Sequence, residues 1–190
     1  MENIRLGFAF CGSFCTFERV LRVMEQMKAD GYDIYPIMSE TASATDTRFG
    51  TAESFIHRIE NICGRKIINT VKAAEPIGPK KMLDVLVVAP CTGNTLAKLS
   101  CGIADSAVTL AVKAHLRNER PVIVGVSSND SLAANAGNIG VLLARRNMYF
   151  VPMKQDDAVG KPRSIVAEME LIPDTVRAAL EGTQIQPILV

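Results

Sequence analysis

The chain has 190 residues, 48% of them hydrophobic and 22% charged, a composition typical of one globular domain and not of a disordered or fibrous protein. Its 21 Lys and Arg side chains balance 20 Asp and Glu and are scattered, so we expect neither nucleic acid nor an anionic membrane as a partner. Five cysteines without a CxxC pair, no basic leader and no apolar run of membrane length predict a reduced cytoplasmic protein without a metal site.

Apolar runs and helical spacings alternate along the chain. The predicted strands are residues 4–10, 32–38, 66–71, 83–89, 122–127 and 148–152, and Pro90 is expected to end the fourth. The predicted helices are residues 16–29, 51–63, 92–99, 105–117 and 132–146, followed by one or two helices within residues 165–180 that are broken at Pro173. Loops are predicted at residues 40–50 and 75–79. Strands separated by helices predict a single α/β domain over residues 1–190, with a Rossmann-like open parallel sheet and helices on both faces.

Four polar turns follow predicted strands: Gly12-Ser13, Ser39, residues 90–95 and residues 127–129. The carboxyl ends of parallel strands meet at one edge of a sheet, where open α/β sheets bind their ligands. We therefore expect these turns to build one ligand site.

Gly12 and Ser13 predict a site for the phosphate of a nucleotide-like cofactor. Glycine lets the backbone approach an anion, the serine hydroxyl can donate a hydrogen bond, and the following helix presents free N–H groups. A P-loop would have a lysine where this chain has Ser13, and no GxGxxG fingerprint occurs. ATP hydrolysis and a dinucleotide are thereby disfavoured, and a mononucleotide such as FMN is preferred. An ordinary turn with a helix cap is the alternative.

The turn Pro90-Cys91-Thr92-Gly93-Asn94-Thr95 opens a predicted helix with two hydroxyls, one carboxamide and free backbone amides. Donors and acceptors of this kind suit the pyrimidine edge of a flavin, whose reduced anionic form a helix N-terminus would favour. The alternative is a helix cap, which needs only one such side chain.

Other candidate residues have simpler interpretations. Cys91 is either a reactive thiol at a helix start or, as we favour, a small packing residue. His57 is expected to be an ordinary surface or core histidine, and His115 a helix C-terminal residue favoured by the dipole. The cations in polar loops are solvated charges or carboxylate partners, and they are Arg48, Lys80, Lys81, Lys161 and Arg163.

A family resemblance rests on residues 84–105, which read Asp-Val-Leu-Val-Val-Ala-Pro-Cys-Thr-Gly-Asn-Thr-Leu-Ala-Lys-Leu-Ser-Cys-Gly-Ile-Ala-Asp. With Gly12-Ser13 and Ser39, this segment resembles the FMN-dependent flavoproteins that include cysteine decarboxylases and flavin prenyltransferases. Within that group, residues 45–50, 74–80 and 127–136 are similar to the subfamily of dipicolinate synthase B subunits of spore-forming bacteria. The resemblance covers essentially the whole chain.

The resemblance implies a Rossmann-like fold and homo-oligomers, either trimers or multiples of trimers, with FMN near a subunit interface. Gly12, Ser13 and Ser39 would surround the phosphate, with the turn at residues 90–95 near the rest of the flavin. The expected cofactor-binding residues are Gly12, Ser13, Ser39, Pro90, Thr92, Asn94, Thr95, Ser127 and Asn129. The chain departs from the decarboxylases, which usually have Pro-Ala-Ser-Ala-Asn-Thr at residues 90–95 and a Pro-Ala-Met-Asn-like run at residues 125–129. These departures argue against decarboxylation of a cysteinyl substrate.

The subfamily implies that the chain works with a separate A subunit in the mother cell of a sporulating bacterium, converting a dihydrodipicolinate-type dicarboxylate into dipicolinate. Either FMN on this chain or NADP on the partner subunit would accept the hydride. We hypothesise two catalytic residues: Asn94, which orients flavin or substrate, and Arg48, which pairs with a substrate carboxylate. The alternatives are a stand-alone FMN-dependent decarboxylase or flavin prenyltransferase, and a non-catalytic subunit that only binds its partner.

Overall fold

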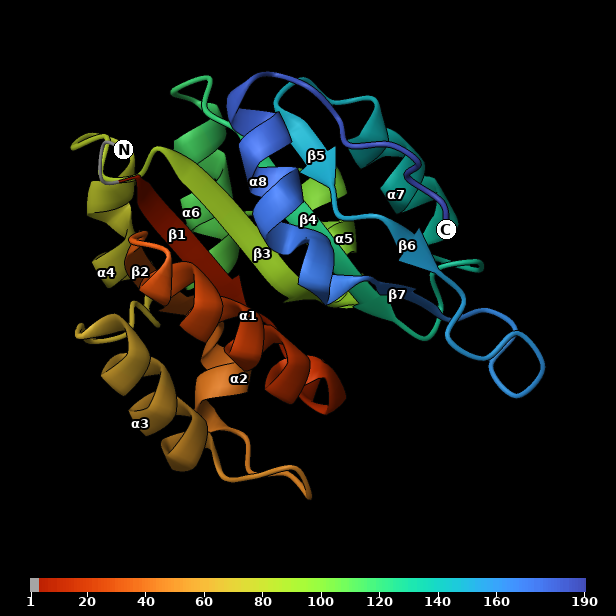
Figure 1. Cartoon of the computed structure of the whole chain (residues 1–190), viewed down its shortest axis with the longest axis horizontal. Helices are drawn as coiled ribbons and strands as arrows, with labels where there is room; N and C mark the ends of the chain where they lie inside the picture. Colours follow the sequence, from red (N-terminus) through yellow and green to blue (C-terminus); the bar gives the residue numbers. More distant parts are fainter. Residues whose placement is uncertain (1–3) are drawn as a thin grey trace.

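The computed structural model describes residues 4–190, a single-domain α/β fold (Figure 1). Its strands are β1 Arg5–Phe10, β2 Asp33–Met38, β3 Val85–Cys91, β4 Val122–Ser128, β5 Met148–Phe150, β6 Met153–Lys154 and β7 Ile165–Ala167. Its α-helices are α1 Phe17–Ala29, α2 Glu40–Ala44, α3 Ala52–Cys63, α4 Val71–Ala74, α5 Gly93–Ser100, α6 Ala107–Leu116, α7 Ala136–Leu143 and α8 Ile172–Leu180. None of the helices within residues 4–190 is long and apolar enough to cross a membrane.

Five strands form the predicted parallel sheet, in the order β2-β1-β3-β4-β5. Gly7 on β1 lies between Tyr35 on β2 and Leu86 on β3, so successive connections run to opposite sides of β1. The order in which strands are added to the sheet therefore reverses between β1 and β3. At such a switch point a parallel sheet leaves a crevice for a ligand.

The sheet as a whole is mixed, because two short antiparallel strands extend the predicted parallel sheet. β7 pairs antiparallel with the end of β4, where Ser127 is opposite Val166, and β6 pairs antiparallel with β7. Residues 165–167 are a strand and not the predicted helix, because pairing with a distant strand overrides their local preference. Figure 1 shows this hairpin and its long loop at the edge of the molecule.

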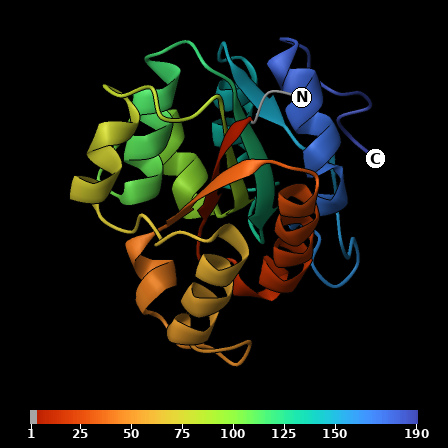
Figure 2. The ribbon, with the colours of Figure 1, turned by 60° about the vertical axis from the view of Figure 1, so that its left-hand side comes forward.

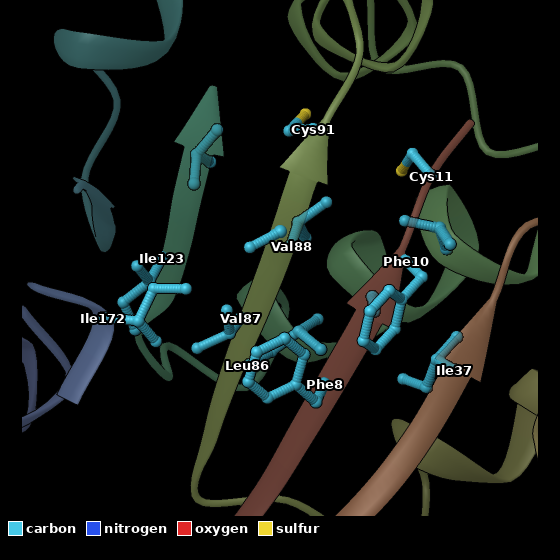
Figure 3. Packing of buried hydrophobic residues seen from close by; sticks show 14 of the residues in the cluster. Phe8, Phe10, Cys11, Ile37, Leu86, Val87, Val88, Cys91, Ile123 and Ile172 are labelled. Atoms are coloured by element: carbon cyan, nitrogen blue, oxygen red, sulfur yellow. The ribbon is translucent and has the colours of Figure 1, made fainter. Parts of the chain in front are cut away.

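Helices cover both faces of the sheet, as predicted. α1 and α8 pack on one face and α5, α6 and α7 on the other, while α3 lies beside α1 (Figure 2). The core between these layers is apolar, and Figure 3 shows Phe8, Phe10, Ile37 and Val88 on adjacent strands. The rings of Phe8 and Phe10 stack with centroids 5.4 Å apart, and both side chains are fully buried. Each such burial stabilises the fold by about 1.5–3 kcal/mol.

Three predicted boundaries are wrong for local reasons. Residues 40–44 are helical because the Ser39 hydroxyl accepts a hydrogen bond from the Ala42 N–H at 3.2 Å and caps α2. Residues 66–71 contain one parallel bridge, from Ile68 to Ile37, in place of a strand. Residues 75–77 form a 3₁₀ turn, since Pro76 stands in its first turn, where the missing N–H has no partner to lose.

Proline positions account for two further differences. β3 continues through Pro90 to Cys91, and its register with β4 shifts between Val88 and Cys91 because proline has no N–H for the ladder. Pro173 lies at the start of α8 and does not break it.

α7 begins at Ala136, four residues later than predicted, because residues 130–135 form a polar turn.

Candidate cofactor and substrate site

Two adjoining cavities open at the carboxyl ends of the parallel strands. The larger measures about 660 Å³ and the smaller about 460 Å³, both within the range of small-molecule sites. Gly12, Thr92 and Asn94 line both cavities, so the turns after β1 and β3 form the ridge between them. The topological switch point therefore carries a two-part site.

Three helices begin at the smaller cavity. Ser39 caps α2, Thr92 caps α5 and Ser106 caps α6. Each capping hydroxyl oxygen accepts a hydrogen bond from a backbone N–H at 3.2–3.3 Å. Ser106 also forms a capping box with Thr109. The Ser39 hydroxyl keeps its own hydrogen available for a ligand, whereas Thr92 shares a hydrogen bond with Thr95 Oγ1 at 3.1 Å and Ser106 shares one with Thr109 Oγ1 at 2.9 Å. Helix starts and a free hydroxyl donor together favour an anion such as a phosphate.

The charged side chains that line the smaller cavity are one cation, Lys98, and two carboxylates, Glu40 and Asp105. Lys98 Nζ lies 2.9 Å from both carboxylate oxygens of Asp105, and this pairing lowers the pKa of Asp105. Glu40 Oε1 accepts the Ala107 N–H at 3.0 Å at the start of α6. A phosphate here would therefore be held by hydroxyls and backbone N–H groups more than by cations.

The fold itself does not require a glycine at position 12, and the missing side chain leaves open space beside the backbone. A Cβ at Gly12 would contact protein only at Phe14, at 3.7 Å, and its φ is not left-handed. At Gly93 a Cβ would lie 2.5 Å from Asn135 Nδ2 and 2.7 Å from Asp130 Oδ1, so these side chains would have to move. The missing side chain at Gly12 thus fits a ligand that approaches the backbone, whereas Gly93 is needed for structure.

Hydroxyls connect the first and fourth strands across the site. Ser13 Oγ lies 2.7 Å from Ser127 Oγ, which in turn lies 2.8 Å from Thr16 Oγ1. Ser127 and Thr16 are buried, whereas Ser13 is partly exposed and lines the larger cavity. Ser127 is therefore satisfied inside the protein and holds Ser13 at the cavity wall.

A carboxylate with built-in support lies in the larger cavity. Asp130 Oδ1 accepts hydrogen bonds from Ser128 Oγ at 2.6 Å and Asn135 Nδ2 at 2.8 Å, and Asp130 Oδ2 also accepts from Asn135 at 2.8 Å. In the same cavity, Lys161 Nζ pairs with Asp156 at 3.0 Å. Lys161 is the single cation among the described residues that line this cavity.

Cys11 and Cys91 lie side by side at the ends of β1 and β3, beneath the ridge (Figure 3). Both are fully buried, and burial raises the pKa of the Cys91 thiol well above its usual value. Cys91 is therefore a packing residue, as favoured from the sequence, and its position at a helix start does not activate it.

His115 corrects a prediction. It is 1% exposed, Nε2 has no hydrogen-bond partner within the described residues, and burial lowers its pKa to about 4. The imidazole is thus neutral at pH 7, so it is a core residue and not a cation that the helix dipole stabilises.

The structure brings most of the predicted residues together at this site. Gly12, Ser13, Ser39, Thr92, Asn94, Thr95, Ser127 and Asn129 line one or both cavities. Pro90 is buried behind them and lines neither. Arg48 lies outside both cavities in an exposed loop, with its guanidinium 4.9 Å from the centre of the Phe49 ring.

Several residues that line the cavities are absent from the sequence-based prediction, among them Glu40, Lys98, Asp105, Ser106, Asp130, Asn135 and Asp156. Lys98 stands four residues after Asn94 on one helix, a spacing that places both on the same face, so it could have been found. Asp130 lies just before and Asn135 within the helix predicted over residues 132–146, so the prediction does not include the turn that they form. Among residues 4–190, no group of three or more His, Cys, Asp or Glu side chains is arranged to hold a metal ion.

Comparison with known proteins assigns the chain to a family and finds relatives that are similar over its full length. The Flavoprotein family model matches residues 1–181. The B subunit of dipicolinate synthase from Bacillus subtilis is 42% identical over 190 residues, which is 100% of this chain and 95% of that protein. The crystal structure of the corresponding B subunit from Bacillus halodurans superimposes with a TM-score of 0.91 at 43% identity, covering 100% and 98% of the two chains.

A more distant structure shares the fold. The FMN-dependent cysteine decarboxylase SpaF is 22% identical, with a TM-score of 0.70 over 94% of this chain and 97% of its own. At this identity the likeness concerns the arrangement of the sheet and helices.

Proposed function

Because this chain belongs to the flavoprotein family, we propose that it is the B subunit of a dipicolinate synthase, which works with a separate A subunit to convert dihydrodipicolinate into dipicolinate. The observation that carries the proposal is the full-length likeness to the B subunit of the Bacillus subtilis enzyme. The two-part site supports it, since a cofactor and a small dicarboxylate each need a place to bind.

FMN is the cofactor that the proposal assigns to the site. Its phosphate would lie in the smaller cavity, against the Gly12 backbone and the hydroxyls of Ser39 and Ser106. Thr92 and Asn94, on the ridge between the cavities, would contact the rest of the flavin. A bound flavin supplies a two-electron acceptor, and NADP on the partner subunit is the competing one.

The substrate would occupy the larger cavity. Lys161 is the cation there that would bind one carboxylate, exchanging its present partner Asp156 for the substrate, and Ser128 and Asn129 add neutral polar groups. Arg48, exposed outside the cavities, would serve a carboxylate only across a subunit contact in the homo-oligomer that the proposal includes. Lys161 is therefore the first residue to test for substrate binding in a single chain.

Reconstitution tests the function. The purified chain, the A subunit, or both would be supplied with the dihydro substrate, NADP and FMN, and dipicolinate would be followed by its ultraviolet absorbance. Formation that needs both proteins supports the proposal, and dependence on added FMN places the oxidation on this chain. Formation that needs both proteins but not FMN assigns this chain a partner-binding role. Activity at the full rate without this chain would contradict the proposal.

Lys161→Ala provides a more local test of the substrate site, with Lys72→Ala, a lysine outside both cavities, as the matched control. Loss of one carboxylate contact should raise KM for the dicarboxylate about ten-fold in Lys161→Ala, in line with a charge-assisted bond of about 1.5–3 kcal/mol. An unchanged KM would remove Lys161 from the substrate site.

A further inference from the structure

Asp130 is the one carboxylate in the larger cavity that no cation of the described residues neutralises. Asp156 shares the cavity but pairs with Lys161 at 3.0 Å. The partners of Asp130 are neutral, and they are Ser128 Oγ and Asn135 Nδ2. Asp130 is therefore a hydrogen-bond acceptor without a cationic partner.

The two oxygens of Asp130 differ in what they can still do. Oδ1 accepts from both Ser128, at 2.6 Å, and Asn135, at 2.8 Å, whereas Oδ2 accepts only from Asn135, at 2.8 Å. A carboxylate oxygen has two acceptor sites, so Oδ2 is free to take one further hydrogen. Asp130 lines the cavity, where that hydrogen would come from a ligand.

A chain of amides behind Asp130 fixes its position. Asn135 is 6% exposed, and its Oδ1 accepts from Asn138 Nδ2 at 2.9 Å. Asn138 Oδ1 accepts from Ser100 Oγ at 2.7 Å, which anchors the chain on α5. Gly93 packs so closely against Asn135 and Asp130 that a side chain at this position would displace them. Support of this kind is what holds a reactive group in one geometry.

We infer that Asp130 is the general base that removes the proton from a substrate bound in the larger cavity, with Asn135 as its positioning residue. The inference rests on the proposed function. Aromatisation of a dihydro ring removes two electrons and two hydrogens. One C–H bond breaks as a hydride, which goes to the oxidised flavin or the oxidised nicotinamide. The second C–H or N–H bond leaves its electron pair in the ring, and its proton passes to Asp130 Oδ2 and then to water.

The charge of the ligand favours this transfer. Asp130 and Asp156 against Lys161 leave the charged groups lining the cavity with an excess of one negative charge. A dicarboxylate beside an ionised Asp130 is repelled, and protonation of Asp130 relieves the repulsion. Binding of a dianion should therefore be accompanied by uptake of a proton.

Calorimetry on the purified chain tests the inference without turnover. Dipicolinate would be titrated at pH 7 in two buffers of different ionisation enthalpy, which reports proton uptake. We expect uptake in the wild type and in Asp156→Asn, which removes the same charge from the same cavity, and none in Asp130→Asn. Asp130→Asn should also bind dipicolinate at least ten-fold more tightly at pH 8.

Turnover should change in the opposite direction. With the A subunit present, Asp130→Asn should lower kcat at least 100-fold, within the range for loss of a general base, and abolish the acid limb of the kcat/KM profile. A residue with a purely structural role would not combine tighter product binding with slower turnover. Equal proton uptake in Asp130→Asn and wild type would overturn the role of Asp130 as the base and leave the proposed function of the chain unaffected. Absence of dipicolinate binding in every protein would overturn both the inference and the assignment of the cavity to this substrate.

Discussion

Ser13 Oγ and Ser127 Oγ lie 2.7 Å apart although 114 residues separate them in the chain. The contact joins the turn after β1 to the end of β4 and so spans the strand between them, β3, whose own turn forms the ridge of the site. The predicted phosphate turn, Gly12-Ser13, is therefore held in place by a side chain of β4, two strands away in the sheet, and not only by the helix that follows the turn.

Replacement of Ser127 by alanine tests this link. Buried Thr16 would lose its partner at 2.8 Å and Ser13 would lose its anchor, so Ser127→Ala should lower the free energy of unfolding by about 1–3 kcal/mol. Urea unfolding measures the change. Ser43→Ala, which removes an exposed hydroxyl bonded to the Glu40 carbonyl, should stay within about 0.5 kcal/mol. Equal effects of the two variants would show that the link has no structural role.

The two glycines at the ridge should respond differently to alanine. Gly12→Ala adds a methyl group that meets only Phe14, so stability should change by less than about 0.5 kcal/mol while FMN affinity falls at least ten-fold. Gly93→Ala should destabilise by about 1–3 kcal/mol, since its Cβ would clash with Asn135 and Asp130. Thermal unfolding and FMN titration of both variants check this. A Gly12→Ala protein that binds FMN normally would remove the backbone approach from the site.

Thiol labelling separates the cavity from the remaining surface. Cys15 and Cys101 are exposed, whereas burial raises the pKa of Cys63 to about 12 and Cys11 and Cys91 are fully buried. Only Cys15 and Cys101 should therefore react with a thiol reagent in the folded protein. Because Cys15 lines the larger cavity, a bound ligand should slow its labelling and leave Cys101 unchanged. Peptide mapping after timed labelling reads both sites, and equal protection of the two would contradict this placement.

His115 should make the protein sensitive to mild acid. Its pKa is lowered to about 4 in the folded chain, mainly by burial, and is near its ordinary value of 6.5 when unfolded. Below pH 6.5 the unfolded chain takes up the proton first, so the free energy of unfolding should fall between pH 6.5 and 4, by on the order of 2–3 kcal/mol. His115→Leu should lose this slope, and His57→Gln, at an exposed position, should keep it. An unchanged slope in His115→Leu would show that other groups cause the acid sensitivity.

The local signals of the sequence account for much of the fold and the site. Apolar runs such as residues 83–89 and helix starts such as Thr92 are properties of short segments, and they place the turns at the carboxyl edge. β7 could not be predicted, because its three residues become a strand by pairing with Ser127 and Ser128 of β4 and with β6. Asp130 and Asn135 could not be identified for a similar reason, since their importance comes from the cavity that distant segments enclose around them.

The phosphate site at the ridge is the feature on which the proposed cofactor depends, and paired titrations of the purified chain with FMN and riboflavin test it most directly. The two flavins share the ring and differ in the phosphate, and quenching of flavin fluorescence reports their binding. We expect FMN to bind at one site per chain with an affinity at least ten-fold higher than that of riboflavin, and Ser39→Ala to reduce this preference. Equal affinity for the two flavins, or no binding of either, would contradict a phosphate site formed by Gly12, Ser39 and Ser106.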